Sequence, residues 1–417
     1  MTQLRSQPVP YQVWGEDIEN GALEQMRRAA ELPIAVRGAL MPDAHQGYGL
    51  PIGGVLATRG AIIPYAVGVD IACRMKMTVF NVSPHVLGQK REKFREALAH
   101  STRFGVGVTW EKPHDHPVME DHAFREVPIL RQLHHTAWQQ LGTSGSGNHF
   151  VEFGELVVRE TIQGGDTAEG EGSRTFGTIP PGNYVALLSH SGSRGLGASI
   201  AEHYTQVAMA QHADLPKAYQ HLAWLDLQGT GAEYWRAMTL AGRYASASHA
   251  IIHQLVASRL RFEVLGGVEN HHNYAWQEEV EGETLVVHRK GATPAGSGVY
   301  GVIPGTMSTP GFVVRGKGYA PSLRSAAHGA GRRMSRAAAI KSLTWEQIEH
   351  KLKQAGVELL SAGLDEAPQA YKDIHSVMEA QTEMVEAVAQ FQPRLVKMAE
   401  DKGGPGKRGG NGKKRKR

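Results

Sequence analysis

The sequence contains a single cysteine, Cys73, among its 417 residues. One thiol excludes an internal disulfide framework, which small secreted domains commonly use. The chain also lacks an apolar run of about 18 residues and a basic-then-apolar leader, so we expect neither a membrane span nor a secretory signal. These absences predict a cytoplasmic protein that has no membrane partner.

Two common nucleotide-binding patterns are also absent. The chain has neither the P-loop pattern GxxxxGK[ST] nor the Lys-x-Asp-Gly element that carries the nucleotidyl group in lysine-dependent ligases. If the protein activates a nucleotide, a histidine must therefore carry it. Histidine is frequent, with 21 copies, so potential metal ligands are plentiful.

The composition is that of a globular chain with a cationic end. Hydrophobic residues make up 41% of the sequence and charged residues 21%, and no Pro/Ser-rich linker interrupts residues 1–400. We therefore expect one large domain there. Residues 401–417 carry a charge of +7, which leaves about −3 on the rest. This Gly-rich segment predicts a disordered basic tail, which is either a solubilising end or a sequence-independent attachment to nucleic-acid phosphates.

Apolar runs and turn residues predict both strands and helices along the chain. Residues 111–122 have the composition of an exposed loop. The predicted strands cover residues 54–58, 61–63, 76–80, 184–188 and 285–288. The predicted helices cover residues 85–100, 125–140, 197–212, 231–261, 344–356 and 375–392.

Candidate metal ligands occur in several polar or glycine-framed motifs. Asp70 and Cys73 lie three residues apart in VGVDIAC, and three histidines follow: His149 in GTSGSGNHFVEF, His190 in SHSGSRGLG and His272 in ENHHNYA. Taken singly, each histidine is more often a structural residue. Together with a carboxylate and a thiolate that can bridge, they suit a dinuclear site for a borderline metal such as Mn, Co or Zn.

Three further histidines lie in the predicted loop. They are His114, His116 and His122. A solvated loop is the preferred interpretation, and metal binding is the alternative.

Two glycine-rich segments allow the backbone to approach an anion closely. They are PGTMSTPG at 304–311 and HGAGRRMSR at 328–336. In the second, His328 precedes Arg332, Arg333 and Arg336 and a predicted Ala-rich helix, whose N-terminus favours phosphate. A histidine placed there can attack a phosphorus atom. The alternative is a helix start with a solvated basic face.

The motifs together resemble the RtcB family of RNA ligases. The matching segments, in the family's order, are MPDAHQGYGLPIGG, IPYAVGVDIAC, GSGNHFVE, HSGSRGLG, HHN, RKGATPA, IPGTM, HGAGRRMSR and DEAPQAYKDI, and they span about residues 41–397. The resemblance implies a family-specific α+β fold around a deep metal-containing cleft, with GTP and two Mn²⁺ ions as cofactors.

The same resemblance implies roles for individual residues. The metal ligands would be Asp70, Cys73, His149, His190 and His272, with Cys73 shared between the two ions, and His328 would take GMP from GTP. Asp43 and His45 would lie near the metal cleft rather than among the ligands. The guanylate contacts would come from Asn148, His149, Phe150, Val151, Glu152, His272, Asn273, Pro304, Gly305, Thr306, Met307, Gly311, His328, Gly329, Ala330, Gly331 and Lys397.

The implied substrate is RNA with a 2′,3′-cyclic phosphate or 3′-phosphate end. The cyclic form is opened, the 3′-phosphate is capped with GMP, and a 5′-hydroxyl then displaces the guanylate. A monomer is expected, and the need for an activating protein is left open.

The chain departs from the family pattern at several positions, which indicates a divergent branch. Arg74 stands where glycine is usual, Gly311 where serine is usual, and Ser248 and His249 where an Asn-Arg pair is usual. The family's terminal Lys-Gly is Lys397-Met398 here. The departures at Gly311 and His249 leave open a metal-dependent 2′,3′-cyclic phosphodiesterase without ligation. The basic tail leaves open a non-catalytic RNA-end-binding protein.

Overall fold

A ten-stranded sheet is the largest element of the computed structural model, which describes residues 3–165 and 172–400. Its strands follow the order β15-β16-β19-β6-β9-β5-β11-β8-β7, and β18 pairs with β19 in parallel while the other pairs are antiparallel. The strands are β5 (Arg74–Phe80), β6 (Phe150–Val158), β7 (Ile162–Gly165), β8 (Ser173–Ile179), β9 (Gly182–Ser191), β11 (Val264–His271), β15 (Tyr300–Ile303), β16 (Gly311–Gly316), β18 (Glu358–Ser361) and β19 (Val385–Met398).

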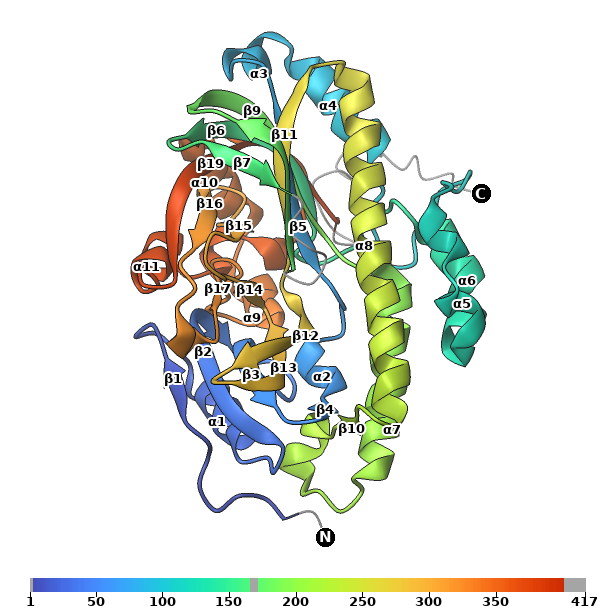
Figure 1. Cartoon of the computed structure of the whole chain (residues 1–417). Coiled ribbons are helices and arrows are strands. Elements are labelled where there is room, and N and C mark those ends of the chain that lie inside the picture. The colour runs from blue at the N-terminus through green and yellow to red at the C-terminus, as the bar shows by residue number, and fades with distance from the viewer. Residues whose placement is uncertain (1–2, 166–171, 401–417) are drawn as a thin grey trace, which may run out of the picture.

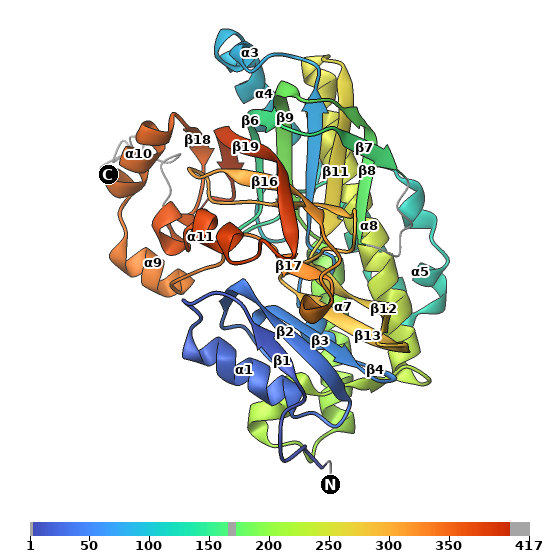
Figure 2. The same cartoon turned by 60° about the vertical axis from the view of Figure 1, so that its left-hand side comes forward.

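A second sheet of five strands lies below the first in Figure 2. Its order is β1-β2-β3-β13-β12. The strands are β1 (Tyr11–Val13), β2 (Ala35–His45), β3 (Ile52–Thr58), β12 (Asn273–Val280) and β13 (Glu283–Lys290). Two short ribbons pair β4 (Ala61–Ile62) with β10 (Leu225–Asp226) and β14 (Ala292–Pro294) with β17 (Ser325–Ala327). The chain passes from the large sheet to the small one between β11 and β12, at His272.

Two long helices run along one side of the structure, α7 (Arg194–Gln211) and α8 (Thr230–Leu260), as Figure 1 shows. The other helices are α1 (Asn20–Ala30), α2 (Pro64–Val67), α3 (His85–Gln89), α4 (Arg91–Ser101), α5 (Ala123–Glu126), α6 (Pro128–Gln140), α9 (Arg336–Ser342), α10 (Trp345–Ala355) and α11 (Ile374–Glu379). Short 3₁₀ turns are η1 (Pro117–Glu120), η3 (Lys217–Leu222), η4 (Ala320–Ser322), η5 (Leu364–Glu366) and η6 (Pro368–Ala370). Within residues 3–165 and 172–400, none of the helices combines the length and apolar character needed to cross a membrane.

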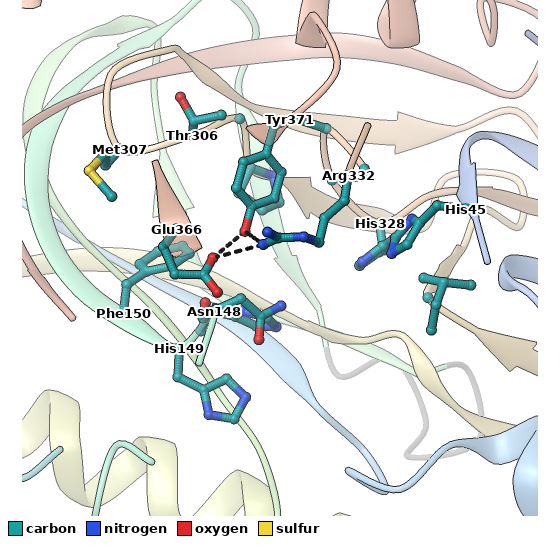
Figure 3. Close-up of a pocket in the computed structure, with 18 of the residues that line it drawn as sticks. His45, Asn148, His149, Phe150, Thr306, Met307, His328, Arg332, Glu366 and Tyr371 are labelled. Carbon is teal, nitrogen blue, oxygen red and sulfur yellow. Dashed lines mark hydrogen bonds and ion pairs between the residues drawn. The ribbon is translucent and has the colours of Figure 1, made fainter. Parts of the chain in front are cut away.

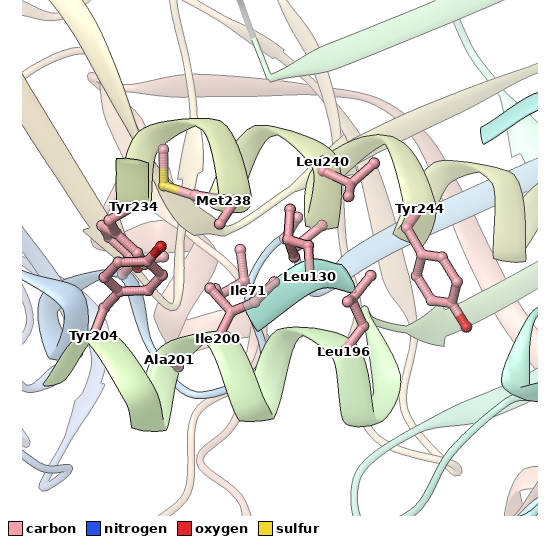
Figure 4. Packing of buried hydrophobic residues seen from close by; sticks show 14 of the residues in the cluster. Ile71, Leu130, Leu196, Ile200, Ala201, Tyr204, Tyr234, Met238, Leu240 and Tyr244 are labelled. Carbon is pink, nitrogen blue, oxygen red and sulfur yellow. The ribbon is translucent and has the colours of Figure 1, made fainter. Parts of the chain in front are cut away.

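Apolar residues at helical spacing hold α7 against α8 (Figure 4). On α7, Leu196, Ile200 and Tyr204 recur every four residues and are buried. Tyr234 and Met238 on α8 meet them with the same spacing. Such a stripe faces one side of a helix because 3.6 residues make one turn. This packing supports the strand ends that carry the candidate site.

Most of the predicted elements are confirmed. The strands at 54–58, 76–80, 184–188 and 285–288 lie within β3, β5, β9 and β13, and the helices at 197–212, 231–261 and 344–356 match α7, α8 and α10 within three residues. The predicted helix at 85–100 is divided into α3 and α4, and the one at 125–140 into α5 and α6. The mixed α/β class is confirmed. The predicted basic tail, residues 401–417, lies outside the described residues.

The helix predicted for residues 375–392 is confirmed over 375–379 and wrong for the rest. Helix α11 ends at Glu379, and β19 begins at Val385. The segment is rich in Glu, Ala and Gln, which favour helices, but β19 pairs on both sides, with β16 and β6. Its buried Val388 and Phe391 pack in the core of the large sheet. Pairing between distant segments has therefore overridden the local helix propensity.

Candidate functional site

Strand ends of the large sheet bring together the five side chains proposed as metal ligands. Two of them precede β5, one precedes β6, one lies near the end of β9, and one joins β11 to β12; they are Asp70, Cys73, His149, His190 and His272. The register of β5, β6, β9 and β11 aligns these strand ends at one edge of the sheet.

Cys73 lies at the centre of this group. Its Sγ is 3.1 Å from Nε2 of His190 and 3.4 Å from Nε2 of His149. On one side, Nε2 of His149 is 3.0 Å from Oδ2 of Asp70. On the other side, Nε2 of His190 is 3.2 Å from Nε2 of His272. The buried atoms of Cys73, His149 and His190 lie within 4.8 Å of one another and can hold a cation.

The outer nitrogens of two histidines fix their ring orientations. Nδ1 of His190 is 3.0 Å from the carbonyl oxygen of Asn148, so this nitrogen carries the proton and Nε2 keeps its lone pair. Nδ1 of His149 instead accepts from the Arg194 guanidinium at 3.0 Å, so Nε2 of the neutral ring donates to Asp70. Ligation of a cation by Nε2 of His149 would displace that proton.

Burial keeps the imidazoles neutral. It lowers the pKa of His149 and holds the pKa values of His190 and His272 well below their usual range. Burial alone would raise the pKa of Asp70, but the hydrogen bond with His149 and the charge of Arg194 lower it. Burial and the neighbouring Asp70 raise the pKa of Cys73. Neutral imidazoles beside an ionised carboxylate suit cation binding, and a bound divalent cation would deprotonate the thiol.

His328 adjoins this group and is held by a buried aspartate. Its ring centroid is 5.0 Å from that of His272. Oδ2 of the fully buried Asp43 accepts from His328 Nδ1 at 2.6 Å and from the His328 main-chain amide at 3.1 Å. Because Nδ1 then carries the proton, Nε2 of a neutral His328 keeps its lone pair as a nucleophile. The prediction that Asp43 lies near the cleft without being among the clustered donors agrees with this geometry.

These groups line one cavity of about 790 Å³. Figure 3 shows its arrangement, with Phe150 and Met307 at one end and His45 and His328 at the other. Arg332 lies between the two ends, where it contacts the Tyr371 hydroxyl at 3.2 Å. Such a volume is in the range of small-molecule sites.

Most of the residues predicted to contact a nucleotide line this cavity. They are Asn148, His149, Phe150, Glu152, His272, Asn273, Pro304, Gly305, Thr306, Met307, Gly311, His328, Gly329, Ala330 and Gly331. Burial raises the pKa of Glu152 well above its usual range. Donors on a bound ligand would favour the ionised carboxylate instead.

The side chains of Val151 and Lys397 are not brought to the cavity. The two residues are cross-strand partners in β6 and β19, and their neighbours Val396 and Met398 do line the cavity. Alternate residues of a strand point to opposite faces. Lys397 therefore lies on the far face, where its ammonium donates to the carbonyl of Leu98 at 3.2 Å.

Several residues in or beside the cavity had no role assigned from the sequence. Glu366 and Tyr371 form ion pairs or hydrogen bonds with Arg332 in the cavity, and Arg194, which does not line the cavity, contacts His149. All three occur in two motifs that resemble the RtcB family, HSGSRGLG and DEAPQAYKDI. These motifs are the feature of the sequence that could have indicated a role for them. Their partners are distant in sequence, so local spacing did not reveal them.

The histidines of the 111–122 segment have local contacts. His116 accepts from the amide of Val118 at 3.1 Å and so caps η1. His114 packs edge-on against Trp110 at 4.9 Å between ring centroids, and His122 is exposed. These contacts agree with the loop interpretation.

The departures from the family pattern fall in different places. Gly311 lines the cavity, whereas the side chains of Arg74, Ser248 and His249 do not. Although Arg74 directly follows the candidate ligand Cys73, its guanidinium pairs with Glu269 and donates to the carbonyl of Gly242 at 2.9 Å. Strand alternation again explains the direction, because Arg74 directly follows Cys73.

A buried network of ion pairs and histidines lies beside the five proposed metal ligands. Glu269 accepts from Lys76 at 2.6 Å and from Arg74, and these cations lower its pKa against the effect of burial. Nearby, the Ser189 hydroxyl lies 2.8 Å from both His249 and His253. The network joins β5, β9 and β11 to α8 and so supports the strands that carry Cys73 and His190.

Replacing Glu269 with glutamine should destabilise the fold by about 3–5 kcal/mol, because two buried cations lose their counter-charge. Urea unfolding followed by circular dichroism measures the change. Glu283→Gln, which breaks the exposed pair with Arg59, is the matched control and should change little. Equal unfolding midpoints for Glu269→Gln and the unchanged protein would contradict a structural role for this network.

Comparison with known proteins agrees with the resemblance found in the motifs. A family model described as "tRNA-splicing ligase RtcB" matches residues 25–129 and 119–399. "RNA-splicing ligase RtcB" of Escherichia coli (strain K12) is 32% identical, over 92% of this chain and 96% of the relative. "tRNA-splicing ligase RtcB" of Nanoarchaeum equitans is 30% identical, over 93% and 95%. The protein of the same description from Thermococcus kodakarensis is 30% identical, over 92% and 94%. The matches extend over nearly all of the chain and include every motif of the site, so this chain belongs to the RtcB family.

Proposed function

We propose that the protein is a GTP-dependent RNA ligase that joins a 3′-phosphate or 2′,3′-cyclic phosphate end to a 5′-hydroxyl end. The observation that carries the proposal is the position of His328, oriented by Asp43 at 2.6 Å and adjoining a buried Cys/His cluster within one cavity. The names of the RtcB relatives, which describe RNA-splicing and tRNA-splicing ligases, support the same reaction class.

In the first step, Nε2 of His328 attacks the α-phosphorus of GTP. The bond between the α-phosphorus and its bridging oxygen to the β-phosphorus breaks, pyrophosphate leaves, and GMP becomes attached to His328. Throughout this step, Asp43 accepts the hydrogen bond from Nδ1 of His328 and stabilises the positive charge that develops on the ring. Arg332, which lies between the two ends of the cavity, is placed to contact phosphate oxygens.

In the following steps the RNA end is activated and joined. A 2′,3′-cyclic end is first opened by water to a 3′-phosphate. An oxygen of this phosphate displaces His328 from the phosphorus of GMP, and the incoming 5′-hydroxyl then attacks the RNA phosphate and expels GMP. The GMP attached to the RNA 3′-phosphate makes the final step favourable, because GMP is a better leaving group than an oxygen of the uncapped phosphate.

The donor set fits two divalent cations that share Cys73. Asp70, Cys73 and His149 would hold one ion, and Cys73, His190 and His272 would hold the other, because successive contacts link Asp70 to His149, His149 to Cys73, Cys73 to His190, and His190 to His272. Thiolate, imidazole and carboxylate together suit Mn²⁺ or another borderline ion. When bound, such ions polarise phosphoryl oxygens and neutralise their charge.

We assign the guanine base to the end of the cavity that contains Glu152, Phe150 and Met307. Glu152 is buried at the cavity wall, where its carboxylate can accept from the two N–H groups on the edge of guanine. The glycines of the 304–311 and 328–331 segments let main-chain groups approach the phosphates.

A ligation assay tests the overall function. An RNA with a 3′-phosphate and a second with a 5′-hydroxyl are incubated with protein, GTP and Mn²⁺, and joined product is expected only when GTP is present. A cyclic-phosphate RNA that is opened without GTP and never joined would instead support the phosphodiesterase alternative. Binding of RNA ends without either reaction would support a non-catalytic protein.

Replacing Asp43 with asparagine should slow attachment of GMP to His328 by about 100-fold, because the ring loses the charge that orients it and stabilises its positive form. Radiolabelled GTP followed over time gives the rate, and a GTP titration separates rate from affinity. We expect the rate to fall while the affinity for GTP stays within about threefold, as for a residue that acts through His328.

Asp17→Asn, at an exposed carboxylate, is the matched control and should react at the normal rate. Loss of GTP affinity in parallel with the rate, or an unchanged rate, would contradict the positioning role of Asp43.

A further inference from the structure

A group of three aromatic rings adjoins the cavity through Tyr48. Tyr48, Tyr65 and His221 form this aromatic platform, in which ring centroids are 5.8 Å apart for Tyr48 and His221 and 4.8 Å apart for Tyr65 and His221. Tyr48 lines the cavity and is 67% exposed, and His221 is exposed beside it. The Tyr48 and His221 rings meet edge to face, at 77°, which leaves much of Tyr48 open to a ligand.

The main chain holds Tyr48 in this exposed position. Lys290 is buried and donates from its ammonium to the carbonyl of Tyr48. The preceding Gly47 exchanges two hydrogen bonds with the side chain of Gln25, at 2.6 and 3.0 Å. Gly49 has a φ of +68°, and a side chain there would meet the carbonyl of His221 at 2.5 Å. The segment is thus fixed against its neighbours while the tyrosine ring projects outward.

The platform lies on the side of the cavity opposite the proposed guanine end. Figure 3 shows Phe150 and Met307 on one side of Arg332 and His45 on the other, beside His328. Tyr48 follows His45 by three residues in the segment that joins β2 to β3, and both line the cavity. A guanine nucleotide beside Glu152 therefore leaves the Tyr48 side for the second substrate.

We propose that Tyr48, supported by Tyr65 and His221, stacks on a nucleobase of the RNA strand whose end enters the cavity. The inference rests on the proposed function and adds a binding subsite for the RNA. An exposed aromatic ring suits this role because every base offers a π-face, so stacking depends on the presence of a base and little on its identity. The bound strand would thus be positioned with its end towards His328.

Fluorescence anisotropy with a short single-stranded RNA that ends in a 3′-phosphate tests the platform, in the presence of Mn²⁺ and without GTP. We expect Tyr48→Ala to weaken binding about tenfold and Tyr48→Phe to bind nearly as tightly as the unchanged protein. A matched RNA whose terminal nucleotides are abasic should bind the unchanged protein about tenfold more weakly and show little further loss with Tyr48→Ala. Val157→Ala is the control for surface substitution. Val157 is exposed and lies at the other end of β6 from Phe150, which lines the cavity.

Equal affinity of Tyr48→Ala and the unchanged protein for ordinary RNA would overturn the proposal. So would an equal loss with ordinary and abasic RNA, since that would show a general effect and no stacking. Attachment of labelled GMP to the unchanged protein, measured without RNA, tests the proposed function separately. A loss of the predicted stacking can therefore be told apart from a loss of GMP attachment, because the two are measured separately.

Discussion

Replacing His328 with asparagine is expected to abolish the covalent protein–GMP adduct. Asparagine is similar in size and still offers polar atoms to Asp43, but its amide is not a nucleophile. Since the adduct depends on the ring nitrogen itself, we expect a loss of at least about a thousandfold in the rate of adduct formation. Incubation with α-labelled GTP and Mn²⁺, followed by denaturing electrophoresis, measures this directly.

The matched control for His328 is His350→Asn, an exposed histidine on α10. This variant should form the adduct at the normal rate. Peptide mapping of the labelled protein then locates the GMP. Label on another residue, or an adduct of normal yield in His328→Asn, would rule out His328 as the nucleophile and with it the proposed first step.

Replacing Cys73 with alanine is expected to remove both of the proposed metal ions, which is the second large effect. Its Sγ lies within 3.4 Å of both His149 and His190, so the two trios of donors share it. Loss of a supporting group around a metal typically costs 10–100-fold in affinity, and loss of a shared ligand should exceed about 100-fold. Metal analysis after dialysis against Mn²⁺ should fall from about two ions per chain to less than one.

His116→Ala is the matched control, because this histidine caps η1 and lies outside the ligand cluster. It should retain the full metal content. Circular dichroism of Cys73→Ala separates metal loss from unfolding, since the alanine fits the space of the thiol. A folded Cys73→Ala protein that still holds two ions would contradict the shared-ligand assignment.

The sequence predicted which residues form the candidate site better than it predicted the residues that contact and orient them. The ordered motifs identified Asp70, Cys73, the three clustered histidines and His328, and the structure brings all of these to one cavity. The order of the motifs made this possible, because a single thiol, imidazole or carboxylate is more often a structural residue than a ligand. The same motifs gave no indication that Asp43 meets His328, since 285 residues separate the two.

Directions of side chains were less predictable than their identities. Arg74 and Lys397 both stood in motif positions next to the site, and both point to the other face of their strands. A strand reverses side-chain direction at every residue, so a neighbour of a site residue faces away from the site. The partners that then receive these cations, Glu269 and the carbonyl of Leu98, come from other elements.

The sequence by itself determined the apolar stripes of α7 and α8 and the chemical groups of the candidate metal cluster around Cys73. Both are local properties, set by helical spacing and by residue type. Only the tertiary structure decided that residues 385–398 form a central strand, that His272 lies where one sheet passes into the other, and that the exposed Tyr48 adjoins the cavity. Each of these depends on which distant strands pair, and the energy of such pairing is not encoded within a local window of residues.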